Sequence, residues 1–263
     1  MNMSRSPVMR LELMTSSAVK SYLSKRTGIV IPIGTTEQHG PDGLIGTDFL
    51  CPEAIARRFG ARSGTLIAPT MAYGMSQFQL GFAGSVSLRP STLAAMTQDI
   101  VASFAVTGFT RIYFLNGHGG NLAPLRCGIH EFYAARSMAG GTEPAPVHCR
   151  VRSWWELSAA DKLRRELYGS SEGSHATPSE VAVTMAAYPD AIRPFVRPAP
   201  PPVADTIIHA GDNYFDAADF CQRYADGRVA SDSALATPEA GQRLLDAAVD
   251  SLAEDFEAFC ASA

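Results

Sequence analysis

Lysine is scarce in this sequence of 263 residues: it occurs only at positions 20, 25 and 162, so arginine supplies nearly all of the positive charge. Acidic residues outnumber basic ones by 26 to 22, which gives a net charge of −4 and an isoelectric point near 5.9. Binding to nucleic acid or to an anionic membrane depends mainly on clustered positive charge. We therefore expect neither nucleic acid nor a membrane to be a partner.

Long hydrophobic runs and export signals are also missing. No stretch reaches the roughly 18 apolar residues that a membrane span needs, and residues 1–7 are not followed by an apolar core of signal-peptide length. The five cysteines have no short, regular spacing, which is typical of reduced thiols. These absences predict a cytoplasmic protein that is neither exported nor embedded in a membrane.

Several common catalytic and nucleotide-binding motifs are absent. No serine stands in a GxSxG turn, and no cysteine is next to a histidine of the motifs described below. Gly119 and Gly120 belong to neither a GxGxxG nor a GxxxxGK[ST] pattern. Serine or thiol nucleophiles and a bound nucleotide are therefore disfavoured.

The sequence does contain a glycine-rich loop with three potential metal ligands. Residues 29–33 form an apolar run typical of a buried strand, and Glu37, His39 and Asp48 follow it. Glu37 and His39 are two residues apart, so an extended backbone points both side chains to the same side. The loop's glycines allow it to fold back and bring Asp48 toward them. Alternatively, the loop is a polar turn in which Asp48 caps a helix that starts near Phe49.

Two further stretches combine histidine with polar or acidic residues. The apolar run 109–115 ends in a loop with His118, and His175 precedes Glu180 near the start of a helix opened by Pro178. The helix dipole also favours a glutamate in the first turn, which would explain Glu180 without a metal. Because none of these stretches contains a thiolate, a hard or borderline cation such as zinc, manganese or iron(II) fits best.

In order and spacing, these motifs resemble the creatininase (creatinine amidohydrolase) family. The matching residues are Glu37-Gln-His39-Gly-Pro with Asp48, then Asn116-Gly-His118-Gly-Gly-Asn121, then His175 followed by Glu180. The resemblance covers residues 19–187 and implies a three-layer α/β/α sandwich with a mostly parallel central sheet. We expect residues 1–263 to form a single domain of this kind. The family also implies a homo-oligomer, a hexamer, and the proline-rich residues 193–203 are a candidate for its interface.

The resemblance implies a site for two divalent metal ions. Asp48 would bridge them, with Glu37 and His118 completing one ion and His39 and Glu180 the other. In creatininase proper, the position two residues after the histidine of the NGH motif is an acidic ligand, whereas this sequence has glycine there. In other family members the glutamate matching Glu180 takes its place. This departure argues against creatinine itself as the substrate.

The implied activity is that of a hydrolase acting on carbon–nitrogen bonds other than peptide bonds, in a small-molecule amide. A hydroxide bridging the two metals would attack a cyclic amide, a lactam or a formamide. His175 would transfer a proton or stabilise the oxyanion, since an imidazole can do either near neutral pH, and Glu172 would assist it. The alternatives are a peptidase of the mycofactocin-precursor type on the same fold, and a metal-retaining subunit without catalytic activity.

A substrate pocket is expected beside these ligands. In the family, the loop matching residues 71–84 lies next to the active site and an aromatic wall faces the substrate. The candidates are Tyr73, Ser76, Phe78, Gly119, Trp154, Trp155 and Ser174. The alternatives are a packed surface loop for residues 71–84 and tryptophans packed under the sheet. The exact substrate, the metal and the number of subunits are left open by the sequence.

Periodicity predicts the surrounding elements. Strands are expected at residues 65–69 and 147–151. Helices are expected at residues 16–24, from residue 49 to 59 with Gly60 as its stop, from Pro90 to the stop at Gly108, from Leu122 through Tyr133, and after a cap at Thr237. Residues 212–226 give no assignable pattern.

Overall fold

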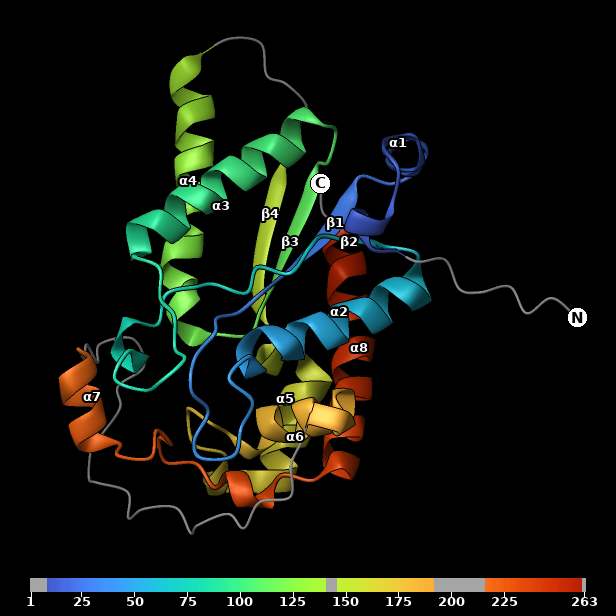
Figure 1. The fold of residues 1–263 in the computed structure, drawn as a ribbon. Coiled ribbons are helices and arrows are strands. Elements are labelled where there is room, and N and C mark those ends of the chain that lie inside the picture. Colours follow the sequence, from blue (N-terminus) through green and yellow to red (C-terminus); the bar gives the residue numbers. More distant parts are fainter. Residues whose placement is uncertain (1–8, 141–145, 192–215, 262–263) are drawn as a thin grey trace, which may run out of the picture.

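A parallel sheet lies at the centre of the molecule. The computed structural model describes residues 9–140, 146–191 and 216–261, so the proline-rich residues 193–203 lie outside it. Four strands run parallel in the order β2-β1-β3-β4 (Figure 1). They are β1 (Gly28–Ile33), β2 (Leu66–Ile67), β3 (Arg111–Asn116) and β4 (His148–Ser153). The predicted strands are therefore present, with β2 shorter than expected.

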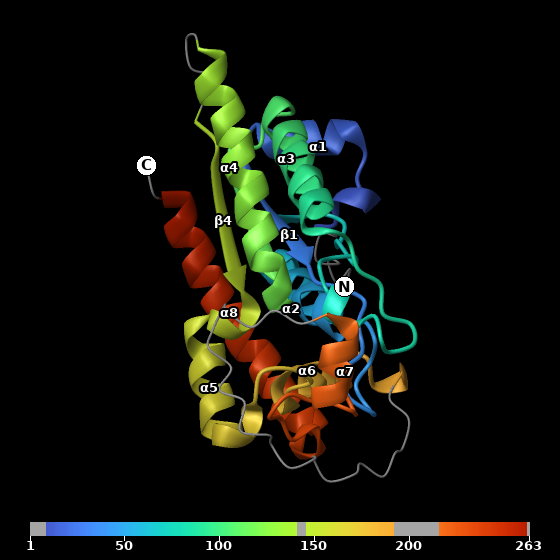
Figure 2. The same cartoon turned by 90° about the vertical axis from the view of Figure 1, so that its left-hand side faces the viewer.

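Helices cover both faces of this sheet and complete three layers (Figures 1 and 2). One face carries α3 (Pro90–Val106) and α4 (Leu122–Ala139), with α1 (Ser16–Leu23) near its edge. The opposite face carries α2 (Thr47–Ser63), α5 (Ser158–Tyr168), α6 (Pro178–Ala187) and α8 (Pro238–Ala261). The α/β/α sandwich with a parallel sheet, predicted from the sequence, is confirmed.

The alternation of side chains along β1 explains why both faces need a cover. Ile29 and Ile31 belong to the hydrophobic cluster on the α3 and α4 side, whereas Val30 belongs to the cluster on the other side. Every residue of β1 is buried. A strand that is apolar on both sides is stable only between two layers of helices.

The helix predicted from residue 49 to 59 is longer at both ends, and the predicted stop at Gly60 was wrong. Gly60 lies inside α2, where a Cβ atom would come within 2.7 Å of Ile67, so the glycine allows the helix to lie close to the sheet. The helix ends at Ser63, and Gly64 follows it in the left-handed conformation with φ of 71°. Glycine adopts this conformation without steric cost, so it is Gly64 that ends the helix.

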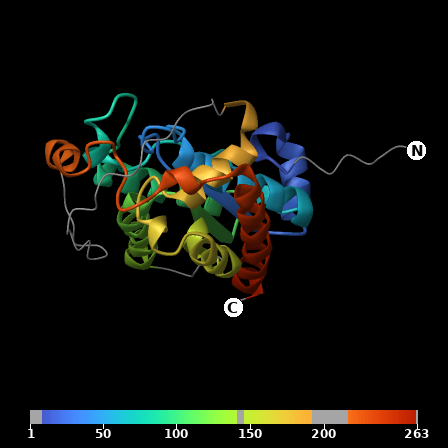
Figure 3. The same ribbon diagram turned by 90° about the horizontal axis from the view of Figure 1, so that it is seen from below.

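Two helices were not predicted. One is α5, and the other is α7 (Ala217–Arg223), which lies within the stretch that showed no pattern. α7 packs beside the short helical turn η2 (Gln77–Gln79) and lies apart from the three main layers (Figure 3). Within the described residues, no helix is both long and apolar enough to cross a membrane.

The register of the sheet aligns the ends of its two central strands. β1 and β3 pair from Gly28 with Arg111 to Ile33 with Asn116. The loops that leave these strands therefore begin side by side at the carboxyl-terminal edge, where open α/β sheets bind their ligands. This edge brings the loop with Glu37 next to the loop with His118.

Candidate metal centre

Two glycines allow Asp48 to approach both strand ends. A Cβ atom on Gly34 would lie 2.3 Å from the backbone of Asp48, and one on Gly117 would lie 1.8 Å from its carbonyl oxygen. Any other residue at either position would push the start of α2 away from the sheet. Asp48 lies in the first turn of α2, whose N-cap is Gly46, and no side-chain hydrogen bond caps the helix. The alternative in which Asp48 acts as a helix cap is therefore wrong.

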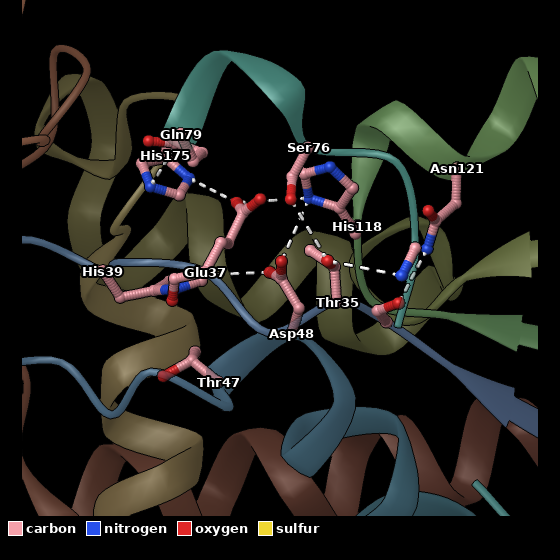
Figure 4. Close-up of polar contacts among 12 residues, drawn as sticks. Thr35, Glu37, His39, Thr47, Asp48, Ser76, Gln79, His118, Asn121 and His175 are labelled. Atoms are coloured by element: carbon pink, nitrogen blue, oxygen red, sulfur yellow. Dashed lines mark hydrogen bonds and ion pairs between the residues drawn. The ribbon is translucent and has the colours of Figure 1, made fainter. Parts of the chain in front are cut away.

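The carboxylate of Asp48 lies between two groups of side chains (Figure 4). Its Oδ1 atom is 3.0 Å from Nε2 of His39, and its Oδ2 atom is 3.0 Å from Nδ1 of His118. On one side Oε1 of Glu37 is 3.3 Å from Nδ1 of His118, and on the other Oε1 of Glu180 is 3.7 Å from Nε2 of His39. Each group of three, with Asp48 in both, has ligand atoms close enough to hold one cation.

Backbone carbonyls orient both imidazoles. Nε2 of His118 lies 3.0 Å from the carbonyl oxygen of Met75, and Nδ1 of His39 lies 3.1 Å from that of Glu37. If these nitrogens carry the proton and donate it to the carbonyls, the other nitrogen of each ring presents a lone pair to Asp48. This is how proteins hold histidine ligands of metals.

The buried carboxylates fit a cation. Glu37 is fully buried and Asp48 is 3% exposed, yet among the described residues both Oε atoms of Glu37 and Oδ2 of Asp48 have no assigned hydrogen bond, and the polar side-chain atoms that face Oε1 of Glu37 and Oδ2 of Asp48 are imidazole nitrogens. Burying a carboxylate without a partner costs several kcal/mol, so such groups are normally paired or bound to metal. Nitrogen and oxygen donors without thiolate match zinc, manganese or iron(II).

The pKa shifts in the cluster indicate that its buried carboxylates stabilise positive charge on the neighbouring groups. Burial alone would lower the pKa of His39, but the carboxylates of Asp48 and Glu180 raise it to about 10. Burial also opposes protonation of His118, and the carboxylates of Glu37 and Asp48 raise its pKa well above the usual value. Burial itself raises the pKa of Glu37. Cations bound here would supply the charge that protons otherwise provide.

Glu180 has two roles in the structure. Its Oε1 atom accepts a hydrogen bond from the backbone nitrogen of Thr177 at 2.6 Å and completes a capping box at the start of α6. The same oxygen faces His39. The helix-start explanation therefore holds and is compatible with the ligand explanation, because the cap fixes the side chain that reaches the cluster.

His175 lies beside the cluster and is held by two glutamines that the sequence did not indicate. Nδ1 of His175 is 3.4 Å from Oε1 of Glu37, and Nε2 is 2.9 Å from the carbonyl oxygen of Gln38. The side-chain Nε2 atoms of Gln38 and Gln79 lie 3.0 and 3.3 Å from the same ring nitrogen, and Gln38 donates to Oε1 of Gln79 at 2.8 Å. Burial, followed by the positive charge of His39, lowers the pKa of His175 to about 3. The imidazole is therefore neutral.

Two aromatic rings, those of Phe78 and Phe220, lie next to the cluster of candidate ligands. Phe78 stacks on His118 with ring centroids 6.2 Å apart, and Phe220 of α7 lies 5.5 Å from Phe78 and 6.5 Å from His175. Phe78 was predicted from the loop, but Phe220 was not, because only tertiary packing brings α7 to this position. The two rings form an apolar surface beside the ligand atoms.

The remaining pocket candidates from the loops differ in placement. Tyr73 is 54% exposed, and Ser76 is buried with its hydroxyl bound to Thr35 and to the carbonyl of Val86. Gly119 and Ser174 are exposed near His118 and His175 in the chain. The hydroxyl of Ser76 therefore stabilises the loop, whereas Tyr73, Gly119 and Ser174 are exposed to solvent.

The three remaining candidates, Trp154, Trp155 and Glu172, contact the hydrophobic cluster or the neighbouring helices. Trp154 is 1% exposed within the hydrophobic cluster under the sheet, and Trp155 packs against that cluster with its ring 6.2 Å from Trp154. Glu172 accepts a hydrogen bond from Ser179 at 2.5 Å and lies 3.6 Å from Arg164. The structure thus shows the packed alternative for Trp154, and it ties Glu172 to α5 and α6.

Comparison with known proteins identifies the family. The family model described as "Creatininase: Creatinine amidohydrolase" matches residues 12–256. The chain therefore belongs to the creatininase family.

Individual relatives have different activities. The chain is 30% identical over 173 residues to creatinine amidohydrolase of Pseudomonas putida, covering 62% of this chain and 65% of that protein. It is 34% identical over 163 residues to the mycofactocin precursor peptide peptidase of Mycobacterium tuberculosis (strain CDC 1551 / Oshkosh), covering 55% and 64%. The chain thus spans slightly less than two thirds of these curated relatives.

Solved structures match over almost the full length. A mutant creatininase described as the Zn-Zn type superposes with a TM-score of 0.78 at 25% identity, covering 98% of this chain and all of that one.

Proposed function

We propose that this protein is a metal-dependent amidohydrolase that cleaves a carbon–nitrogen bond of a small amide. The observation that carries the proposal is the position of Asp48 between two groups of buried side chains, with carboxylate oxygens that have no assigned hydrogen bond. Glu37 and His118 with Asp48 would hold one divalent cation, and His39 and Glu180 with Asp48 the other. The Zn-Zn description of a matching creatininase supports a pair of ions.

Gly120 supports the assignment of Glu180 as a ligand. A Cβ atom on Gly120 would lie 2.5 Å from the carbonyl oxygen of Met75 and 2.6 Å from Nε2 of His118. An acidic side chain at this position would displace the contact that orients His118. The fifth ligand would then come from elsewhere, and Glu180 is a second carboxylate, besides Asp48, that faces His39.

The chain's own residues suit amide hydrolysis once the cations are present. A pair of divalent ions lowers the pKa of water toward neutrality and polarises a carbonyl. His175 lies beside the ligands, with Nδ1 3.4 Å from Oε1 of Glu37, and its imidazole would take up a proton from water. It would return this proton to the departing nitrogen. The rings of Phe78 and Phe220 would exclude bulk water from the same side.

The substrate is proposed to be a non-peptide amide: a cyclic amide, a lactam or a formamide. A peptide substrate is the second candidate, because the identity to the mycofactocin precursor peptidase is as high as that to creatinine amidohydrolase. A metal-retaining subunit without turnover is the third.

A metal analysis followed by a hydrolysis screen separates these candidates. The purified protein is stripped of metal, reloaded with zinc, manganese or iron(II), and analysed for ions per chain. It is then offered cyclic amides, lactams, N-formyl compounds and short peptides, with the Asp48→Asn variant as control. Release of amine or formate from the first three groups supports the proposal. Turnover of peptides alone favours the peptidase, and bound metal without any turnover contradicts an enzymatic role.

A further inference from the structure

A cavity lies at the opposite edge of the sheet from the candidate metal centre. It has a volume of about 480 Å³, is lined by the first residues of β1 and β3, by the end of α1 and by the last turns of α8, and includes Gly28, Arg111 and Cys260. Figure 1 shows these segments meeting around the start of β1. The volume falls within the range of small-molecule sites, about 300–1,000 Å³. β1 runs from this cavity at Gly28 to the metal ligands beyond Ile33, so the two places are separate.

The rim of this cavity is positively charged in a chain that is negative overall. Lys25, Arg26 and Arg111 line it together with a single carboxylate, Glu257. These four formal charges sum to +2, whereas the whole chain carries −4. Within the described part of the chain, Lys25 forms no ion pair with a side chain. A local excess of positive charge around a concave surface attracts small anions.

The floor of the cavity is aromatic and rigid. Phe59 and Phe256 are 1% and 6% exposed, and their rings meet edge to face at 5.4 Å. A Cβ atom on Gly28 would lie 2.8 Å from the ring of Phe256, so only glycine leaves this ring in place. Beside the rings, the hydroxyls of Thr27 and Thr110 pair at 2.6 Å. An apolar floor under a polar rim suits a ligand with a flat ring at one end and a charge at the other.

We propose that this cavity binds a small organic anion, a carboxylate or a phosphate ester that carries a planar apolar group. The apolar group points toward the small exposed parts of Phe59 and Phe256 at the bottom of the cavity, and the anionic group contacts Lys25 and Arg26 at the rim. Arg26 is already positioned, since its Nη1 donates to the carbonyl oxygen of Ser63 at 2.6 Å and the guanidinium keeps further donors. The inference does not depend on the amidohydrolase activity.

Two exposed cysteines provide the test within one protein. Cys260 lines the cavity, whereas Cys127 is exposed on α4 and does not line it. The full-length protein is treated with a thiol-alkylating reagent in the presence of increasing benzoate or phenyl phosphate, and mass spectrometry follows both cysteines. We expect saturable protection of Cys260 by at least one probe and no change at Cys127. The stronger probe identifies the anionic group as carboxylate or phosphate.

Matched variants show whether the charges are responsible. Lys25→Gln combined with Arg26→Gln should weaken protection about tenfold, which is about 1.4 kcal/mol. Lys20→Gln combined with Arg89→Gln removes the same charge from exposed positions outside the cavity and should leave protection unchanged. Absence of saturable protection by either probe in the wild-type protein would overturn the proposal. So would equal weakening in both double variants, because only the overall charge would then matter.

Discussion

The Oδ2 atom of Asp48 lies 3.0 Å from Nδ1 of His118, although one residue starts a helix and the other follows a strand far along the chain. The contact exists because β1 and β3 end in register and because Gly34 and Gly117 leave room for the start of α2 between them. It places one carboxylate at the centre of the candidate metal centre. The predictions below test how that centre is built.

Replacing Gly120 by alanine should disturb the metal centre, whereas replacing Gly119 should not. The new Cβ atom at position 120 would lie 2.6 Å from Nε2 of His118 and break its contact with Met75. Loss of such an orienting hydrogen bond lowers metal affinity about 10- to 100-fold. Nothing lies within 4 Å of a Cβ atom on Gly119, so Gly119→Ala is the matched control. Metal titration of both variants gives the answer; equal affinities would mean that the orientation of His118 is unimportant.

The variant Glu180→Gln separates the cap of α6 from metal binding. Glutamine can still accept the hydrogen bond from Thr177, so the free energy of unfolding of the metal-free protein should change by less than about 1 kcal/mol. The neutral amide is a poor metal ligand, and we expect the metal content to fall from about two ions per chain to about one. The catalytic rate should fall about 100-fold or more, since an ion contributes several kcal/mol to the transition state. A variant with unchanged metal content would show that Glu180 serves only the helix.

Gln79 is expected to position His175. Its Oε1 atom accepts from Gln38, and its amide nitrogen faces the imidazole. Gln79→Leu should therefore lower kcat about tenfold through misplacement of the ring while leaving the metal content unchanged. Gln77 belongs to the same short helical turn but is exposed, so Gln77→Leu is the control. A change in KM alone, with kcat unchanged, would contradict the prediction that Gln79 acts through His175.

Tyr113 should stabilise the fold through its hydroxyl group. The side chain is fully buried, and the hydroxyl donates to Oδ2 of Asp255 at 2.7 Å. Tyr113→Phe is expected to lower the free energy of unfolding by about 1–2 kcal/mol, whereas Tyr73→Phe at an exposed position should change it by less than about 0.5 kcal/mol. Chemical denaturation measures both.

The same tyrosine predicts a pH dependence. Burial, followed by the hydrogen bond to Asp255, raises the pKa of the Tyr113 phenol in the folded protein. Unfolded tyrosine ionises near pH 10, so the stabilisation is complete below about pH 10 and declines at higher pH. The difference between wild type and Tyr113→Phe should therefore shrink above this pH. A difference that stays constant would contradict the link to ionisation.

The sequence predicted the parts of the molecule that depend on local pattern. The apolar runs gave β1 and β3, and the position of histidine and carboxylate directly after them gave the candidate ligands, because parallel strands end at one edge. The position of Phe220 and the pairing of Gln38 with Gln79 were not predictable in this way. They arise from contacts between segments far apart in the chain, and α7 is too short for its periodicity to be read. The predicted stop at Gly60 was wrong because a glycine in a helical pattern can mark close packing against a neighbouring element as well as the end of the helix.

The most direct test of the central proposal is the metal content of the Asp48→Ala variant. Asp99, exposed on α3, provides the control substitution Asp99→Ala. Both proteins are reloaded with zinc or manganese and analysed for ions per chain, and circular dichroism confirms that both are folded. The shared position of Asp48 predicts that Asp48→Ala loses both ions or nearly so, while Asp99→Ala keeps about two. Unchanged metal content in a folded Asp48→Ala protein would contradict the proposal that this carboxylate joins the two halves of the site.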